Sequence, residues 1–73
     1  MNTYELTVVI ERHEDGRFLA VCPVLQGCYT EGESEQEARD LIVDAIRLHI
    51  ESRRDRGEAI PDEVATEKIT VSV

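Results

Sequence analysis

One segment of this chain has the spacing of an amphipathic helix, and segments of strand type lie on both sides of it. Ser34 is a suitable N-cap, and Glu37, three residues later, completes a capping box. Gly57 is a C-cap candidate and Pro61 bars continuation, so we expect the helix to end near Arg56. One helix between strands restricts the chain to an α+β fold with the helix on one face of a sheet.

The expected helix has faces of different character at 100° per residue. A stripe with alternating charges should face solvent. The stripe that should pack on the sheet consists of Ala38, Leu41, Ile42, Ala45, Leu48 and His49. Val43, Ile46 and Ile50 extend the apolar arc beyond what one sheet face needs, and we predict that they contact a second copy in a homodimer or higher homo-oligomer.

Two segments before the helix predict a β-hairpin. Residues 4–11 alternate between apolar and polar side chains, and residues 17–22 resume extended character before Pro23 stops them. Asp15 and Gly16 form a turn signal between the two segments. If Glu11 faces Arg17, the core face holds three cross-strand pairs: Ile10 with Phe18, Val8 with Ala20 and Leu6 with Cys22.

Two further strands complete the predicted β-β-β-α-β order. Residues 28–31 can return beside the second strand with Cys28 opposite Cys22, which places both thiols under the helix. Residues 67–73 alternate and are rich in β-branched side chains, so they predict a fourth strand. A right-handed crossover would lay this strand parallel to the first. The predicted sheet order is 3-2-1-4.

Composition excludes several classes of function. The 73 residues allow one domain, residues 1–73, with a single modest core. Sixteen acidic and eight basic side chains give a formal charge of -8, which argues against nucleic acid as a direct partner and favours a basic protein. Neither a signal peptide nor a membrane-spanning run is expected, so the default location is the cytoplasm.

No chemistry-bearing motif predicts an enzyme. Cys22 and Cys28 are separated by five residues and lack the further ligands of a zinc site, so we expect reduced core thiols and no metal or cofactor. His13 and His49 have no Ser or Cys partner at a known motif spacing. Strand carboxylates do not form a convergent magnesium set, which makes a metal-dependent nuclease the least favoured alternative.

The order of signals along the chain resembles the HicB antitoxin family. Eight features carry the resemblance in order: Asp15-Gly16, Phe18, Ala20, Pro23, Gly27-Cys28, Gly32-Glu33-Ser34, Glu37-Ala38, and Gly57 with Pro61. The resemblance implies a partial ribonuclease-H-like fold that masks a small basic HicA-type toxin, which cleaves messenger RNA.

This sequence departs from the family pattern in two places. The loop after Pro23 lacks the acidic residue and second proline usual in the family. Many family members also carry a C-terminal DNA-binding module, and this sequence stops at Val73, so we do not expect it to bind an operator by itself.

Two surfaces are candidates for partner binding. One is the sheet face away from the helix, with Thr7, Val9, Leu19, Val21 and Tyr29; the alternative is a half-apolar solvated sheet. The other is the acidic stretch at residues 31–44, with Glu31, Glu33, Glu35 and Asp40. The alternative there is plain helix electrostatics, because acids stabilise a helix N-terminus. For function, the alternative to an antitoxin is a stand-alone dimeric regulatory or scaffolding module with no toxin partner.

Overall fold

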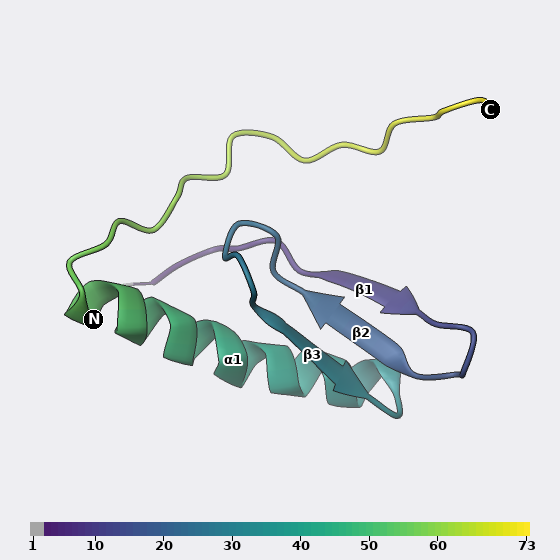
Figure 1. Ribbon diagram of the computed structural model, residues 1–73, viewed down its shortest axis with the longest axis horizontal. Helices are drawn as coiled ribbons and strands as arrows, with labels where there is room; N and C mark the ends of the chain where they lie inside the picture. The colour runs from purple at the N-terminus through teal and green to yellow at the C-terminus, as the bar shows by residue number, and fades with distance from the viewer. Residues whose placement is uncertain (1–2) are drawn as a thin grey trace.

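A three-stranded antiparallel sheet and one long helix make up the fold (Figure 1). The structure is a computed structural model, and it describes residues 3–73. The strands are β1 (Val9–Arg12), β2 (Phe18–Val21) and β3 (Tyr29–Gly32), in the order β1-β2-β3, and the helix is α1 (Glu35–Asp55). Helix α1 packs on one face of this sheet and lies closest to β3. The predicted α+β class with a helix on one sheet face is confirmed.

The first hairpin forms as predicted, but its register differs by two residues. Ile10 lies opposite Ala20 rather than Phe18. The turn is shorter than the predicted pairing requires, because the His13 amide donates to the Arg17 carbonyl at 2.9 Å and the Gly16 amide donates to the His13 carbonyl at 3.0 Å. The predicted pairing of Glu11 with Arg17 is therefore wrong. A shift of two residues leaves every side chain on its own face, so the predicted core face is preserved.

The pairing between β2 and β3 follows the prediction. The Cys22 amide donates to the Cys28 carbonyl at 3.0 Å, one step beyond the pair of Val21 and Tyr29. Both cysteines are free, and their exposures are 0% and 1%. The loop between them is compact because Leu25 is buried in the core and its backbone bonds to both cysteines, at 3.1 Å and 3.0 Å.

Local hydrogen bonds define both ends of α1. The Ser34 hydroxyl accepts from the Glu37 amide at 3.0 Å, which confirms the predicted N-cap. The Glu37 carboxylate accepts at 3.1 Å from the amide of Glu33 rather than from that of Ser34, so the capping box is displaced by one residue. At the other end Gly57 has a φ of 71°, and the amides of residues 57 and 58 close a Schellman motif onto residues 54 and 53.

The face of α1 that meets the sheet is rotated from the predicted stripe. Ala38 and Ile42 are buried as expected, but Leu41 and Leu48 are exposed, and Ile50 is buried in their place. Close approach at β3 explains the rotation, because a Cβ on Gly32 would lie only 2.7 Å from the Ala38 backbone nitrogen. Contact at this point places Ala38 and Ile42 over the sheet. The fully formed core consists of Ala20, Cys22, Leu25, Cys28, Ala38, Ile42 and Ile50.

The predicted fourth strand does not form in the part of the chain that the structure describes. Residues 67–73 are extended but unpaired, so the sheet order is β1-β2-β3 and the predicted order 3-2-1-4 is not confirmed. Alternation shows that a segment suits a sheet, but it does not specify the edge with which that segment pairs. We call residues 64–73 the tail; it runs alongside β1 in the same direction and stands away from it (Figure 1).

Strand β1 is also shorter than residues 4–11, which we predicted to pair. The register that joins Val9 to Val21 would bring Thr7 opposite Pro23, and proline has no amide to donate.

No helix among residues 3–73 has both the length and the apolar character needed to cross a bilayer.

Candidate protein-binding surface

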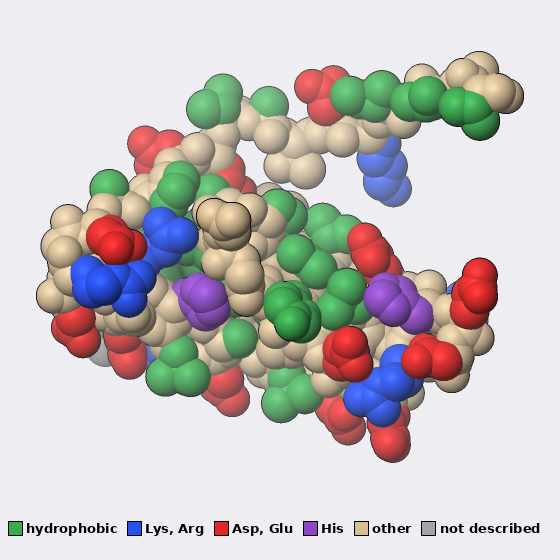
Figure 2. Space-filling model, viewed as in Figure 1, with side chains coloured by type: hydrophobic (Ala, Val, Ile, Leu, Met, Phe, Trp, Pro, Cys, Tyr) green, Lys and Arg blue, Asp and Glu red, His purple; other side chains and the backbone are tan. Residues whose placement is uncertain are grey.

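No helix covers the sheet face opposite α1 within residues 3–73, and we call this face the open face. Its side chains form two cross-strand rows: Val9 with Val21 and Tyr29, and Glu11 with Leu19 and Glu31. Val9 and Tyr29 are exposed, whereas Leu19 and Val21 are half-buried by their neighbours. Hydrophobic side chains gather over the strands in Figure 2. The sheet therefore brings together five of the predicted partner-binding residues.

Charged side chains border the open face at its hairpin end (Figure 2). Arg17 Nε lies 3.4 Å from a Glu31 carboxylate oxygen, and His13 Nε2 lies 3.4 Å from Glu11. These four side chains are about half exposed, and exposed ion pairs contribute only about 0–1 kcal/mol. A partner that supplies its own cations can therefore replace such a pairing at small cost.

Further acidic residues lie where the chain passes from β3 into α1. Glu33 and Glu35 follow Glu31 along the chain, and Glu35 lies 3.8 Å from Arg39. Glu35 is the first residue of α1, and Asp40 lies further along the same helix, where it accepts from Gln36 at 2.8 Å. We call Glu31, Glu33 and Glu35, which are neighbours along the chain, the acidic group; Glu31 is its member on the open face.

Thr7 already has a partner within the chain. Its amide and hydroxyl donate to the two carboxylate oxygens of Glu63, at 2.8 Å and 2.9 Å. The carboxylate takes the place of the strand partner that Pro23 cannot provide. Sequence reasoning missed Glu63, because the predicted register placed Val21 rather than Pro23 opposite Thr7.

A shallow groove of about 690 Å³ accompanies this tie. Its walls are the start of the tail on one side, and Thr7, Val9, Pro23 and Val24 on the other. The groove therefore adjoins the open face at the end remote from the hairpin turn.

The predicted dimer contacts on α1 are unequally available. Val43 is exposed, Ile46 is half-buried against the core, and Ile50 is only 8% exposed. These three side chains line a second groove of about 550 Å³ together with Tyr4. Sequence reasoning missed the exposure of Leu41 and Leu48, because it assigned both to the core-facing stripe.

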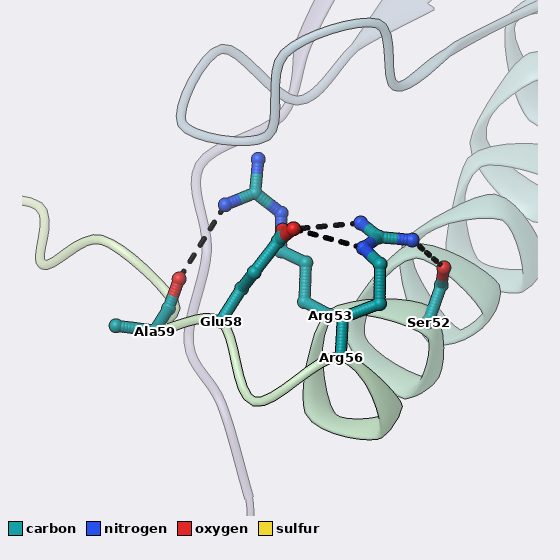
Figure 3. A network of polar contacts seen from close by, with 5 residues as sticks. All are labelled: Ser52, Arg53, Arg56, Glu58 and Ala59. Carbon is teal, nitrogen blue, oxygen red and sulfur yellow. Dashed lines mark hydrogen bonds and ion pairs between the residues drawn. The ribbon is translucent and has the colours of Figure 1, made fainter.

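Polar contacts at the end of α1 direct the chain toward the tail (Figure 3). Arg56 donates to both carboxylate oxygens of Glu58, at 2.9 Å and 3.1 Å, and also to the Ser52 hydroxyl. Arg53 donates to the Ala59 carbonyl at 3.4 Å. The hydrogen bond from Arg56 lowers the pKa of Glu58 below its ordinary value, and the same bond raises the pKa of Arg56. These contacts lie at the Schellman motif, where the chain leaves the helix.

The thiols and metal-ligating side chains offer little reactive chemistry. Burial raises the pKa of both Cys22 and Cys28, so their thiols stay protonated and weakly nucleophilic at neutral pH. Within residues 3–73 the structure holds no group of three His, Cys, Asp or Glu side chains placed to bind a metal ion. What the surface presents is apolar contact area beside negative charge.

Comparison with known proteins identifies relatives across nearly the whole chain. Residues 6–72 match a family model described as "HicB_like antitoxin of bacterial toxin-antitoxin system". A UPF0150 protein of Thermoplasma acidophilum is 45% identical over 65 residues, which cover 89% of this chain and 93% of the relative. A UPF0150 protein of Synechocystis is 40% identical, with 82% and 76% covered, and one of Archaeoglobus fulgidus is 33% identical, with 88% and 96% covered. No solved structure matches the chain significantly.

Proposed function

Because the chain belongs to the HicB-like antitoxin family, we propose that it is the antitoxin of a toxin–antitoxin pair and acts by covering its toxin with the open face. The observation that carries this proposal is the apolar row of Val9, Val21 and Tyr29 beside acidic Glu31. Exposed apolar rows with a polar border are typical of protein interfaces. The antitoxin works by occlusion, and its own side chains perform no catalytic step.

The partner that fits this surface is a small basic protein of HicA type. A ribonuclease needs cationic side chains to hold RNA phosphates, and those groups are attracted to a chain of net charge -8. Carboxylates of Glu31, Glu33 and Glu35 then occupy positions that phosphates would take. The pair meets in the cytoplasm, where messenger RNA is the toxin's substrate.

We expect a gene for a short basic protein beside this chain's gene, and co-expression of the two proteins tests the proposal. We expect the two proteins to copurify, and we expect Tyr29→Arg to weaken binding by about 30-fold, because a central interface aromatic contributes about 2 kcal/mol or more. Leu48→Arg is a matched control, since Leu48 is 65% exposed and Tyr29 is 61% exposed, but Leu48 lies on α1. Equal losses from both variants, or failure to bind, would contradict use of the open face; failure to bind would favour a stand-alone dimeric module.

A charge-matched pair of variants tests the role of the acidic group. Changing Glu31, Glu33 and Glu35 together to Gln should slow association by about tenfold at low salt, because complementary charge mainly raises the association rate. The control neutralises three acids elsewhere on the helix, with Asp44→Asn, Glu51→Gln and Asp55→Asn. If the control slows association equally, net charge alone acts and the position of the acidic group is irrelevant.

A further inference from the structure

The tail carries several apolar side chains that are exposed to solvent. Val64, Ile69, Val71 and Val73 are all at least 73% exposed, and three of them alternate with polar residues. Figure 2 shows hydrophobic side chains along this segment, which projects from the body. The structure assigns the tail no strand, although its β-branched alternation is typical of one. The tail therefore has the side-chain pattern of a β-strand but no partner strand among the residues that the structure describes.

Strand β1 offers a matching free edge. It is the outermost strand beside β2, and the bond from His13 to Arg17 shows that its odd-numbered residues direct their backbone groups toward β2. The amides and carbonyls of Val8, Ile10 and Arg12 therefore point outward. The other edge strand, β3, lies close under α1, whereas Leu6, Val8 and Ile10 are only partly buried. An exposed edge of this kind is a template for another strand.

The tie at Glu63 holds the tail's base away from the free edge of its own β1. Thr7 shares the parity of Val9, so its amide and the Glu63 carboxylate meet on the side that faces β2. The groove of about 690 Å³ then separates residues 62–67 from Thr7 and Val9. The tail is thus extended and displaced, in position to leave the molecule.

Charge favours a second copy as the occupant. The tail contains one acid, Glu67, and the chain's only lysine, Lys68, so its net charge is zero and residues 1–63 carry the whole charge of -8. A neutral strand can approach another acidic copy without the repulsion that two bodies would experience. Glu5 and Glu11, which flank the edge of β1, are complementary to Lys68.

We propose that two copies exchange tails, so that residues 64–73 of each copy add a strand to the free edge of β1 in the other. A two-fold arrangement satisfies both edges at once, because every copy supplies one tail and accepts one. Ile69, Val71 and Val73 then lie beside the partly buried Leu6, Val8 and Ile10. This assembly is independent of toxin binding.

Sedimentation of the full chain and of a chain ending at Glu63 is the first test. We expect a dimer for the full chain at micromolar concentrations and a monomer for the shortened chain, with equal helix content by circular dichroism. Val71→Pro removes a backbone donor and should weaken the dimer about tenfold, whereas Val71→Ala should weaken it less. A monomeric full chain, or a dimer that survives removal of the tail, overturns the proposal.

Crosslinking distinguishes a tail that pairs with β1 of a second copy from a tail that pairs with its own β1. A carbodiimide joins Lys68 to nearby carboxylates, and mixing equal amounts of nitrogen-15-labelled and unlabelled chains marks each crosslink as inter- or intramolecular. We expect mixed-isotope products between Lys68 and Glu5 or Glu11. Products confined to single-isotope chains would show that the tail closes on its own β1, which overturns exchange.

Discussion

The two ends of α1 are built in different ways. At its beginning, Gly32 admits the helix backbone so closely that no Cβ fits, and the Thr30 hydroxyl donates to the Ala38 carbonyl at 3.1 Å. At its end, a Schellman motif and the pair of Arg56 and Glu58 release the chain into residues that are almost all exposed. The start of the helix is therefore committed to the chain's own core, whereas the segment after its end remains available to a partner.

Gly32→Ala should have the largest effect on this difference. The added Cβ would meet the Ala38 backbone nitrogen at 2.7 Å, and backbone cannot yield as the end of a flexible side chain can. We expect a loss of about 2–3 kcal/mol in the free energy of unfolding, measured by urea denaturation. If Gly32→Ala lowers the free energy of unfolding by less than Gly57→Ala does, the start of the helix is not more closely packed than its end.

Gly57→Ala tests the other end of α1, where the backbone angle rather than a steric clash should determine the loss of stability. Gly57 has a φ of 71° and open surroundings, so the cost is that of a left-handed backbone, about 1–2 kcal/mol. Gly57→Asn should recover part of this loss, because Asn tolerates that conformation better. Equal costs for Ala and Asn would point to a cause other than the backbone angle.

Ser34→Ala should cost about 1 kcal/mol, since it removes the acceptor of the Glu37 amide. Ser34→Asp keeps an acceptor and adds a negative charge at the helix N-terminus, so its stability should stay near that of the unchanged chain. Thermal unfolding of the two variants side by side gives the measurement. If Asp destabilises as much as Ala, the hydrogen bond is not the source of the effect.

Glu63→Ala should cost still less in global stability, about 0.5–1 kcal/mol, because its two hydrogen bonds to Thr7 are exposed. The clearer readout is hydrogen exchange at the Thr7 amide, which should become faster. Glu67→Ala is the control, since Glu67 lies in the tail and does not bond to Thr7. If hydrogen exchange at the Thr7 amide is unchanged in Glu63→Ala, the hydrogen bonds between Thr7 and Glu63 do not form in solution.

The pair of Arg56 and Glu58 should give the smallest effect. Because the folded pKa of Glu58 is lowered, its contribution to stability is present above the unfolded pKa and is lost as pH falls through the folded pKa. Both side chains are about half exposed to solvent, which keeps that contribution small. Carboxyl NMR titration should show a depressed midpoint for Glu58 that Arg56→Gln returns toward the ordinary value; an unchanged midpoint would contradict the pairing.

Local chemistry made much of the fold predictable. Ser34 and Gly57 marked the ends of the helix, and alternation with a turn signal gave the hairpin and the return strand with Cys22 opposite Cys28. These features depend on neighbours in sequence. The hairpin register was missed because His13 pairs with Arg17, so the turn is shorter than the predicted pairing of Glu11 with Arg17 allows.

Features that depend on distant contacts were not predictable in the same way. The facing stripe of α1 is determined by contact between Gly32 and Ala38, and the path of the tail by Glu63 and Thr7, which are 56 residues apart. For the candidate site, strand alternation correctly grouped Val9, Val21 and Tyr29 on one face. It did not reveal that Thr7 is already bonded or that Ile50 belongs to the core.

The tie between Thr7 and Glu63 also has a consequence for the order in which the protein is assembled during synthesis. The hairpin, the return strand and α1 contact neighbours along the chain, so this body can form on a fast, local route. The tie joins Thr7, which is translated before the hairpin, to Glu63, which is translated after α1. We expect refolding of a chain ending at Glu63 to match that of the full chain in its fast phase, with any later, concentration-dependent phase confined to the full chain. The body of a nascent copy would then be folded before residues 64–73 meet a second copy.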